Sequence, residues 1–166
     1  MIYPPADPNR VRQADADDEE ELIGLCRALH DENALFPMSE RKVRDILRRA
    51  FDRNGGVIGV VGKGRIEGAI CLTLSTQWYA DEWYIEELFN YVYPEFRRSS
   101  NARDLIAFAK MVSGELELPL LIGVLSNTRT AAKVRMYQHQ LGKPAGAFFL
   151  HGAVTGAGME TANVRQ

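Results

Sequence analysis

The chain has 166 residues, of which 46% are hydrophobic and 25% charged, and its formal net charge is −2. This is the composition of one ordinary globular domain, and it provides no overall attraction to nucleic acid or to an anionic membrane. We expect a cytoplasmic protein, because the sequence shows no apolar signal segment and no apolar run long enough to span a membrane. Cys26 and Cys71 lie in apolar patterns, which predicts buried thiols rather than a disulfide or a metal site.

The first half of the chain predicts a strand, two helices and a hairpin. The proline-rich residues 1–10 predict an extended arm. The spacing of apolar residues then predicts these elements: a strand at 11–14, helices at 17–31 and 39–52, and strands at 57–62 and 66–74. Asp17 followed by Glu20 is typical of a capping box, and Ser39 is a candidate N-cap. The glycines Gly62 and Gly64 favour a hairpin turn between the two strands.

The second half predicts strands alternating with helices. The elements expected there are a strand at 83–93, a helix from about 101 to 114, a strand at 120–125, a helix through 139 and a last strand at 147–150. The unbroken apolar run 120–125 is typical of a parallel strand buried on both faces. Asn127 or Thr128 can cap the fourth helix, and Gly142 should end it. Residues 152–166 predict a loose tail.

An anion site is predicted where the strand at 83–93 meets the following helix. A helix N-terminus leaves backbone N–H groups without partners and carries the positive end of the helix dipole. The residues expected around this site are small or basic: Arg97, Arg98, Ser99, Ser100, Asn101, Ala102 and Arg103. A pyrophosphate suits such a site. An ordinary strand-to-helix turn is the alternative interpretation.

The same residues resemble a known family. Arg97-x-x-Ser100-x-Ala102 resembles the Q/R-x-x-G-x-G/A motif of the GNAT (GCN5-related N-acetyltransferase) superfamily, in which this loop holds the pyrophosphate of acetyl-CoA. The lead-in from Val92 to Arg97 resembles the common form V-x-P-x-x-R. Ser100 stands where the family usually has glycine, so the backbone is less free there.

A second segment supports the resemblance. Asn127, Ala131, Met136-Tyr137 and Leu141-Gly142 resemble the family's second CoA-contacting segment, although the usual Gly-Phe ending is absent. The stretch W-Y-I-E-E-L-F-N-Y-V-x-P also resembles GNAT-like proteins from bacteriophage genomes.

The resemblance implies an α/β fold of GNAT type, with a mixed central sheet, flanking helices and splayed strands 4 and 5. It places this domain at residues 11–151, after an arm at 1–10 and before a tail at 152–166. In the family, the pantetheine arm of CoA lies between the splayed strands. By position, the backbone that would bind it belongs to Tyr91, Val92 and Tyr93.

The resemblance also implies an activity, the transfer of an acetyl group from acetyl-CoA to a primary amine by direct attack, without a metal. Tyr137 matches the family's proton donor, and Glu86 and Glu87 are the best candidates for the base. Strand alternation allows only one of the two glutamates to face the cleft. Tyr137 could instead be a core residue, and the glutamates a solvent-facing pair. Alternative bases are His30, His139 and His151.

The acceptor is expected to be an amine-bearing small molecule or protein, which the sequence does not name. Four aromatic residues could form an acceptor pocket, a homodimer contact or the edge of the core: Trp78, Tyr79, Trp83 and Tyr84. A GNAT-like domain that binds CoA or a protein without catalysis is the second hypothesis. A nucleic-acid module that uses the arginines at 97–103 is disfavoured by the acidic remainder of the chain.

Overall fold

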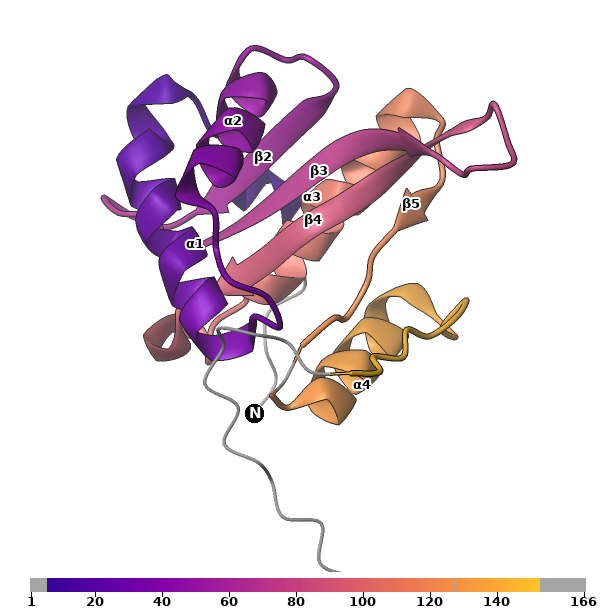
Figure 1. Cartoon of the computed structure of the whole chain (residues 1–166). Helices are drawn as coiled ribbons and strands as arrows, with labels where there is room; N and C mark the ends of the chain where they lie inside the picture. The colour runs from indigo at the N-terminus through magenta and orange to yellow at the C-terminus, as the bar shows by residue number, and fades with distance from the viewer. Residues whose placement is uncertain (1–5, 127, 153–166) are drawn as a thin grey trace, which may run out of the picture.

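The computed structural model describes residues 6–126 and 128–152 (Figure 1). Its helices are α1 (Glu19–Asn33), α2 (Glu40–Phe51), α3 (Asn101–Leu116) and α4 (Thr130–Leu141). Its strands are β1 (Arg12–Gln13), β2 (Gly56–Val61), β3 (Gly68–Thr76), β4 (Trp83–Val92) and β5 (Leu120–Leu121). Short 3-10 turns are η1 (Pro8–Arg10), η2 (Ala16–Asp18) and η3 (Pro94–Phe96).

The strands form one mixed sheet in the order β1-β2-β3-β4-β5. Neighbours from β1 to β4 are antiparallel, and β5 is parallel to β4. A parallel pair needs a crossover connection, which α3 provides here. The predicted α/β fold with a mixed central sheet is therefore confirmed.

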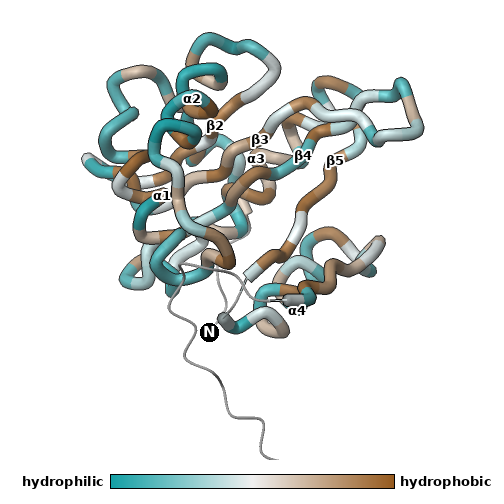
Figure 2. The backbone as a smooth tube through the Cα atoms, viewed as in Figure 1, coloured by the Kyte–Doolittle hydropathy of each residue, from teal (hydrophilic) through white to brown (hydrophobic). Residues whose placement is uncertain are grey.

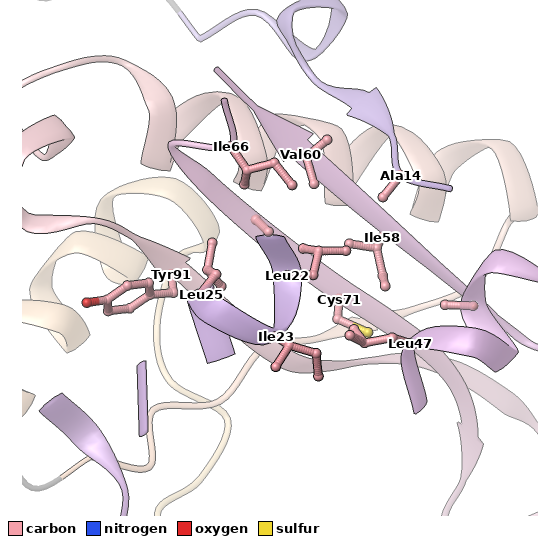
Figure 3. Packing of buried hydrophobic residues seen from close by; sticks show 12 residues of the cluster. Ala14, Leu22, Ile23, Leu25, Leu47, Ile58, Val60, Ile66, Cys71 and Tyr91 are labelled. Atoms are coloured by element: carbon pink, nitrogen blue, oxygen red, sulfur yellow. The ribbon is translucent and has the colours of Figure 1, made fainter. Parts of the chain in front are cut away.

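Helices cover both faces of the sheet. α1 and α2 pack on one face and α3 on the other (Figure 1). On the first face, α1 presents three fully buried residues, Leu22, Ile23 and Leu25, to the β-branched residues of the sheet (Figure 3). Cys26 and Cys71 are buried as predicted, and burial raises the pKa of each thiol to about 12.

The start of α1 differs from the predicted cap. Asp15 and Asp18 form a capping box around η2, which leads into α1, two residues before the predicted pair Asp17 and Glu20. Arg12 holds the Asp18 carboxylate with two bonds of 2.7 Å, so this carboxylate is fixed where it can accept the Asp15 N–H. The prediction of Ser39 as the cap of α2 is confirmed.

The run 120–125 was predicted to be a strand buried on both faces, and this prediction is wrong for most of its length. Only Leu120 and Leu121 pair with β4. Leu121 and Leu125 are 40% and 59% exposed. Within the described residues no strand lies on the other side of β5, so the run has sheet support on one edge only. Figure 2 shows this apolar stretch running from β5 towards α4, apart from the rest of the sheet.

The C-terminal elements also differ from prediction. No strand forms at 147–150, and Phe148 and Phe149 are 80% and 95% exposed. α4 begins only at Thr130, because Arg129 before it has a φ of 51° in the left-handed region and cannot continue a helix. Asn127, one of the predicted caps, lies outside the described residues, as do 1–5 and 153–166.

Candidate active site

β4 and β5 separate soon after they pair. Ile85 lies opposite Leu120 and Glu86 opposite Leu121, and no described residue after Leu121 pairs with β4. β4 continues to Val92, whereas the chain after β5 turns away towards α4 (Figure 1). The predicted splay is therefore confirmed, and it leaves the β5-facing edge of β4 open beyond Glu86.

A β-bulge lies in β4 at this point. Across the antiparallel pair, Leu72 lies opposite Glu87 and Cys71 lies opposite Phe89, so Leu88 is an extra residue without a partner position. Bulges are common beside active sites because they change the direction in which a side chain points. Leu88 thus marks a change in side-chain direction at the edge of the gap.

The bulge brings Glu87 and Asn90 onto one face of the sheet. Their positions differ by three, which in a regular strand would place them on opposite faces. Across β3 their partners are Leu72 and Ile70, which are two residues apart and both belong to the apolar cluster on the α3 face. Glu87 and Asn90 therefore both lie on the α3 face.

Glu87 lies where the two strands part. Its side chain accepts a hydrogen bond of 3.4 Å from the N–H of Gly123, in the segment that follows β5. Burial, with a smaller contribution from the negative charge of Glu86, raises the pKa of the Glu87 carboxyl to about 7. A carboxylate with this pKa can take a proton near neutral pH and can also release it.

The structure separates Glu87 from the other candidate base. Glu86 is the neighbouring residue in β4, so alternation directs it to the opposite face, which α1 and α2 cover. Of the two, Glu87 is the one that lies on the same face as the segment leading to α4.

Tyr137 of α4 reaches this face of β4. Its hydroxyl oxygen accepts a hydrogen bond of 3.1 Å from Nδ2 of Asn90. Burial is the main reason that the pKa of Tyr137 is raised, and the nearby Glu87 carboxylate raises it further. The Asn90 amide and the Tyr137 phenol thus meet on this face, near enough to the Glu87 carboxylate for its charge to act on the phenol.

The loop before α3 presents backbone N–H groups at alternate positions. Within the described chain, no hydrogen bond engages the N–H of Arg98, Ser100 or Ala102, whereas that of Asn101 is bonded to Ser99 Oγ at 3.1 Å. Such groups at a helix N-terminus can bind an anion. Ser100 has φ −82° and ψ −7°, which any residue adopts, so this loop does not require glycine there.

Arg97 fixes the loop to the strand and to α1. Its Nε donates to the Val92 carbonyl at 3.0 Å, and its Nη2 donates to Glu32 at 2.5 Å. The guanidinium also lies 5.3 Å from the ring centre of Tyr91, whose hydroxyl donates to the same Glu32 carboxylate at 3.0 Å. These hydrogen bonds, with the one from Arg97 foremost, hold the pKa of Glu32 below its usual range.

The side chains of Ser100 and Asn101 point into the protein. Ser100 Oγ donates to Asp104 at 2.7 Å and accepts a bond from Arg10, which also pairs with Asp104 at 2.8 Å. Asn101 Nδ2 donates to Glu67 at 2.8 Å. These two residues therefore set the loop's shape, and their side chains are not available to a ligand.

The remaining predicted positions have mixed roles. Arg98 and Ser99 are exposed beside the loop, and Arg103 is half-buried on α3. The N–H of Tyr93 is bonded to the Glu67 carbonyl at 3.0 Å, on the β3 side. Asn127 lies outside the described residues, but the neighbouring Thr128 bonds Asn33 at 3.1 Å and so ties the segment before α4 to the end of α1.

Several residues of this region escaped the sequence analysis. Asn90 was missed because regular alternation would place its side chain on the opposite face of the strand from that of Glu87. The bulge that changes this cannot be recognised in the sequence. Glu32 is brought to the loop only by the packing of α1. The pair Ser100 and Asp104 was detectable, because residues four apart on a helix are neighbours.

The predicted aromatic group is divided by the structure. Trp78 and Tyr79 lie in the β3–β4 hairpin, 93% and 71% exposed, with their rings edge-to-face and centres 5.3 Å apart. Neither is part of the core edge. Among the described residues there is no cluster of three or more side chains suited to hold a metal ion, and no helix has the length and apolar character to cross a membrane.

Comparison with solved structures gives several similar folds. An integron cassette protein, HFX_CASS3, from the mobile metagenome of Cole Harbour Salt Marsh matches with a TM-score of 0.69 at 18% identity, over 90% of this chain and 93% of that one. AAC(6')-Iy, in complex with the bisubstrate analogue CoA-S-monomethyl-acetylneamine, matches with a TM-score of 0.64 at 14% identity, over 86% and 95% of the two chains. A ribosomal-protein-alanine N-acetyltransferase from Brucella melitensis biovar Abortus 2308 matches with a TM-score of 0.65 at 12% identity, over 86% and 97%.

The chain has the GNAT fold. No family model and no curated protein matches the sequence. The fold is therefore shown by structure, with the order of elements and the separated β4 and β5 as its evidence. Beyond Glu86 the open edge of β4 leads from Glu87 to the loop before α3, which Arg97 Nε bonds to the Val92 carbonyl at 3.0 Å.

Proposed function

We propose that the chain is a CoA-dependent N-acetyltransferase that moves an acetyl group from acetyl-CoA to a primary amine. The observation that carries this proposal is the meeting of Glu87 and Tyr137 where β4 and β5 part. One group has a pKa near neutrality and the other is a half-buried phenol, as a base and an acid require.

The α3 loop fits the pyrophosphate of CoA. The free N–H groups of Arg98, Ser100 and Ala102 would bind its oxygens, assisted by the exposed Arg98 side chain. The open edge of β4 near Val92 would contribute backbone groups to the pantetheine arm, whereas the N–H of Tyr93 is bonded to Glu67 on the β3 side. When bound, acetyl-CoA supplies the acetyl group as a thioester.

The protein's own residues would then carry two protons. Glu87 takes one proton from the nitrogen, either from an ammonium before attack, which frees the lone pair, or from an amine as the new C–N bond forms, and later releases it to solvent. Tyr137 gives its proton to the sulfur as the C–S bond breaks, and recovers one from solvent. The segments on either side of the gap hold the reactants together, which provides a large part of the acceleration in any such transfer.

The proposed acceptor is either a small-molecule amine or an amine of a protein. AAC(6')-Iy was solved with an acetylneamine analogue, and the Brucella protein is named for ribosomal-protein alanine. The test panel should therefore contain an aminoglycoside, a peptide with an N-terminal alanine, a lysine peptide and a polyamine.

The experiment combines acetyl-CoA binding, measured by thermal shift, with release of free CoA over this panel. We expect a concentration-dependent rise in melting temperature and turnover with at least one amine. Tyr137→Phe keeps the ring but removes the acid, so turnover should fall by roughly 10²–10⁴-fold while binding stays near wild type. Binding without turnover would instead support a CoA-binding domain without catalysis, and no binding would refute both.

A further inference from the structure

The side chain of Asn90 links β4 to α4, the helix that carries Tyr137. It lies on β4 opposite Ile70, and the Leu88 bulge brings it to the same face as Glu87. Its Nδ2 donates to the Tyr137 hydroxyl oxygen at 3.1 Å, across 47 positions of sequence. No other described hydrogen bond uses the Asn90 side chain or the Tyr137 hydroxyl.

The direction of this bond decides where the phenolic proton can go. A hydroxyl has one proton to donate, and its oxygen can accept. When Asn90 occupies the acceptor side, the proton of Tyr137 must point away from the amide. The gap between β4 and β5 borders this face, and Glu87 lies along β4 on the same side.

We propose that Asn90 is a positioning residue that holds the Tyr137 hydroxyl as an acceptor and so directs its proton into the gap between β4 and β5. This role rests on the proposed acetyl transfer, in which Tyr137 is the acid. Asn90 itself need not touch either reactant. It would act by keeping the acid in one orientation before each turnover.

Electrostatics agree with this geometry. Burial and the Glu87 charge both raise the pKa of Tyr137, which makes the phenol a poorer acid. The bond donated by Asn90 opposes them, because a donor to the oxygen stabilises the phenolate. Asn90 therefore both orients the proton and makes it easier to release.

Two substitutions of Asn90 distinguish an effect of the direction of its hydrogen bond to Tyr137 from an effect of side-chain packing. Asn90→Asp has nearly the same shape but can only accept, so it would draw the Tyr137 proton back towards β4. Asn90→Ala removes the bond without reversing it. Asn54→Asp and Asn54→Ala make the same changes at an exposed position after α2 and serve as controls.

The experiment measures kcat, KM and the pH profile of the full chain, together with amide NMR. A positioned acid contributes roughly 10²–10⁴-fold, so we expect kcat to fall about a hundredfold in Asn90→Asp and about tenfold in Asn90→Ala, with little change in the KM for acetyl-CoA. In Asn90→Asp, the added negative charge near Glu87 should shift the acid limb of the pH–rate profile. Loss of the oriented Tyr137 proton should instead lower the maximum rate of the profile. The two effects can therefore be measured separately.

NMR provides a readout that does not need catalysis. In the wild type, one Asn90 side-chain amide proton should shift upfield on Tyr137→Phe, because it loses its acceptor. If the two Asn90 variants turn over like the wild type, or if Tyr137→Phe leaves both amide protons unmoved, the positioning role is wrong. If the wild type acetylates no amine, the proposed function fails instead, whatever the amide protons do.

Discussion

Ser100 donates its hydroxyl proton to Asp104 at 2.7 Å, and both side chains are buried at the first turn of α3. Arg10, from the turn before β1, binds both of them, and the Asp7 N–H donates to the other Asp104 oxygen at 2.8 Å. The serine that replaces the usual glycine is therefore the centre of a contact that fastens the N-terminal segment to the loop. Its hydroxyl serves the loop's structure.

The first prediction concerns this serine. Ser100→Gly should lower stability by about 1–3 kcal/mol, because it leaves the buried Asp104 with one partner fewer. It should not improve acetyl-CoA affinity, since the backbone at Ser100 needs no glycine. Chemical denaturation and calorimetric titration measure the two effects. Ser100→Ala removes the same hydroxyl without adding backbone freedom, and a tighter-binding Ser100→Gly would contradict this reading.

The second prediction tests the N–H groups of the loop. Ala102 is the second residue of α3, where proline is tolerated, and its N–H makes no described hydrogen bond. Ala102→Pro should therefore weaken acetyl-CoA binding about tenfold, the worth of one strong hydrogen bond to a charged group, with a smaller effect on the melting temperature of the free protein. Arg41→Pro makes the matching change in α2. Equal binding by the two variants would show that the loop does not hold the phosphates.

The third prediction concerns the pH dependence of Glu87. Activity should rise through an acid limb near pH 7, where this carboxyl loses its proton. Glu87→Gln should remove the limb and most of the turnover, whereas Glu86→Gln should retain the limb. Glu115→Gln, on the exposed side of α3, controls for the lost charge. A limb that survives in Glu87→Gln would assign the proton to solvent or to another group.

The Glu87 carboxyl should also make the free energy of unfolding depend on pH. Its pKa is raised on folding from an ordinary value of 4.5 to about 7, so the folded state holds the proton that the unfolded chain releases. The stabilising contribution is fully present below pH 4.5 and is lost as the pH rises through 7. Glu87→Gln should flatten the decline in unfolding free energy between these values. Denaturant titrations at several pH values measure this slope.

The fourth prediction concerns the pair formed by Glu32 and Arg97. Glu32→Gln keeps the shape of the side chain but removes the negative charge that pairs with the Arg97 guanidinium. Because the pair is only partly buried, the free energy of unfolding should fall by no more than about 1 kcal/mol. Acetyl-CoA affinity should rise several-fold and become more dependent on salt, because a freed guanidinium can bind phosphate. A loss of affinity would show instead that Arg97 acts by holding the loop in place.

The sequence was sufficient for the order of elements as far as α4 and for the separated strands. The order of elements follows from local apolar periodicity, and the separated strands were implied by the resemblance of the loop at 97–102 to the GNAT family. It was not sufficient for the end of the sheet. The segment containing Phe148 has the composition of a strand, but a strand also needs a partner edge, and none of the described residues provides one.

The site was predictable in its kinds of residue and not in its geometry. Glu87 and Tyr137 could be named from their positions, but the choice between Glu86 and Glu87 depended on which face the strand presents. Asn90 depended on a single extra residue, Leu88, which reverses alternation and has no sequence signature of its own. Arg97 was expected to be available to an anion. Instead it forms an ion pair with Glu32, a residue of α1 that is far away in sequence and is brought to the loop by the packing of α1.

The helix that carries Tyr137 has no buried side chain, in contrast to α3, which has six. Few contacts therefore resist its local opening, and its amides should exchange with deuterium long before those of α3. A ligand that spans the gap would rest against both β4 and this helix, and its binding should slow that exchange. The proposed proton donor is thus attached to the least buried of the four described helices, which would allow the α4 side of the gap to open without disturbing the sheet.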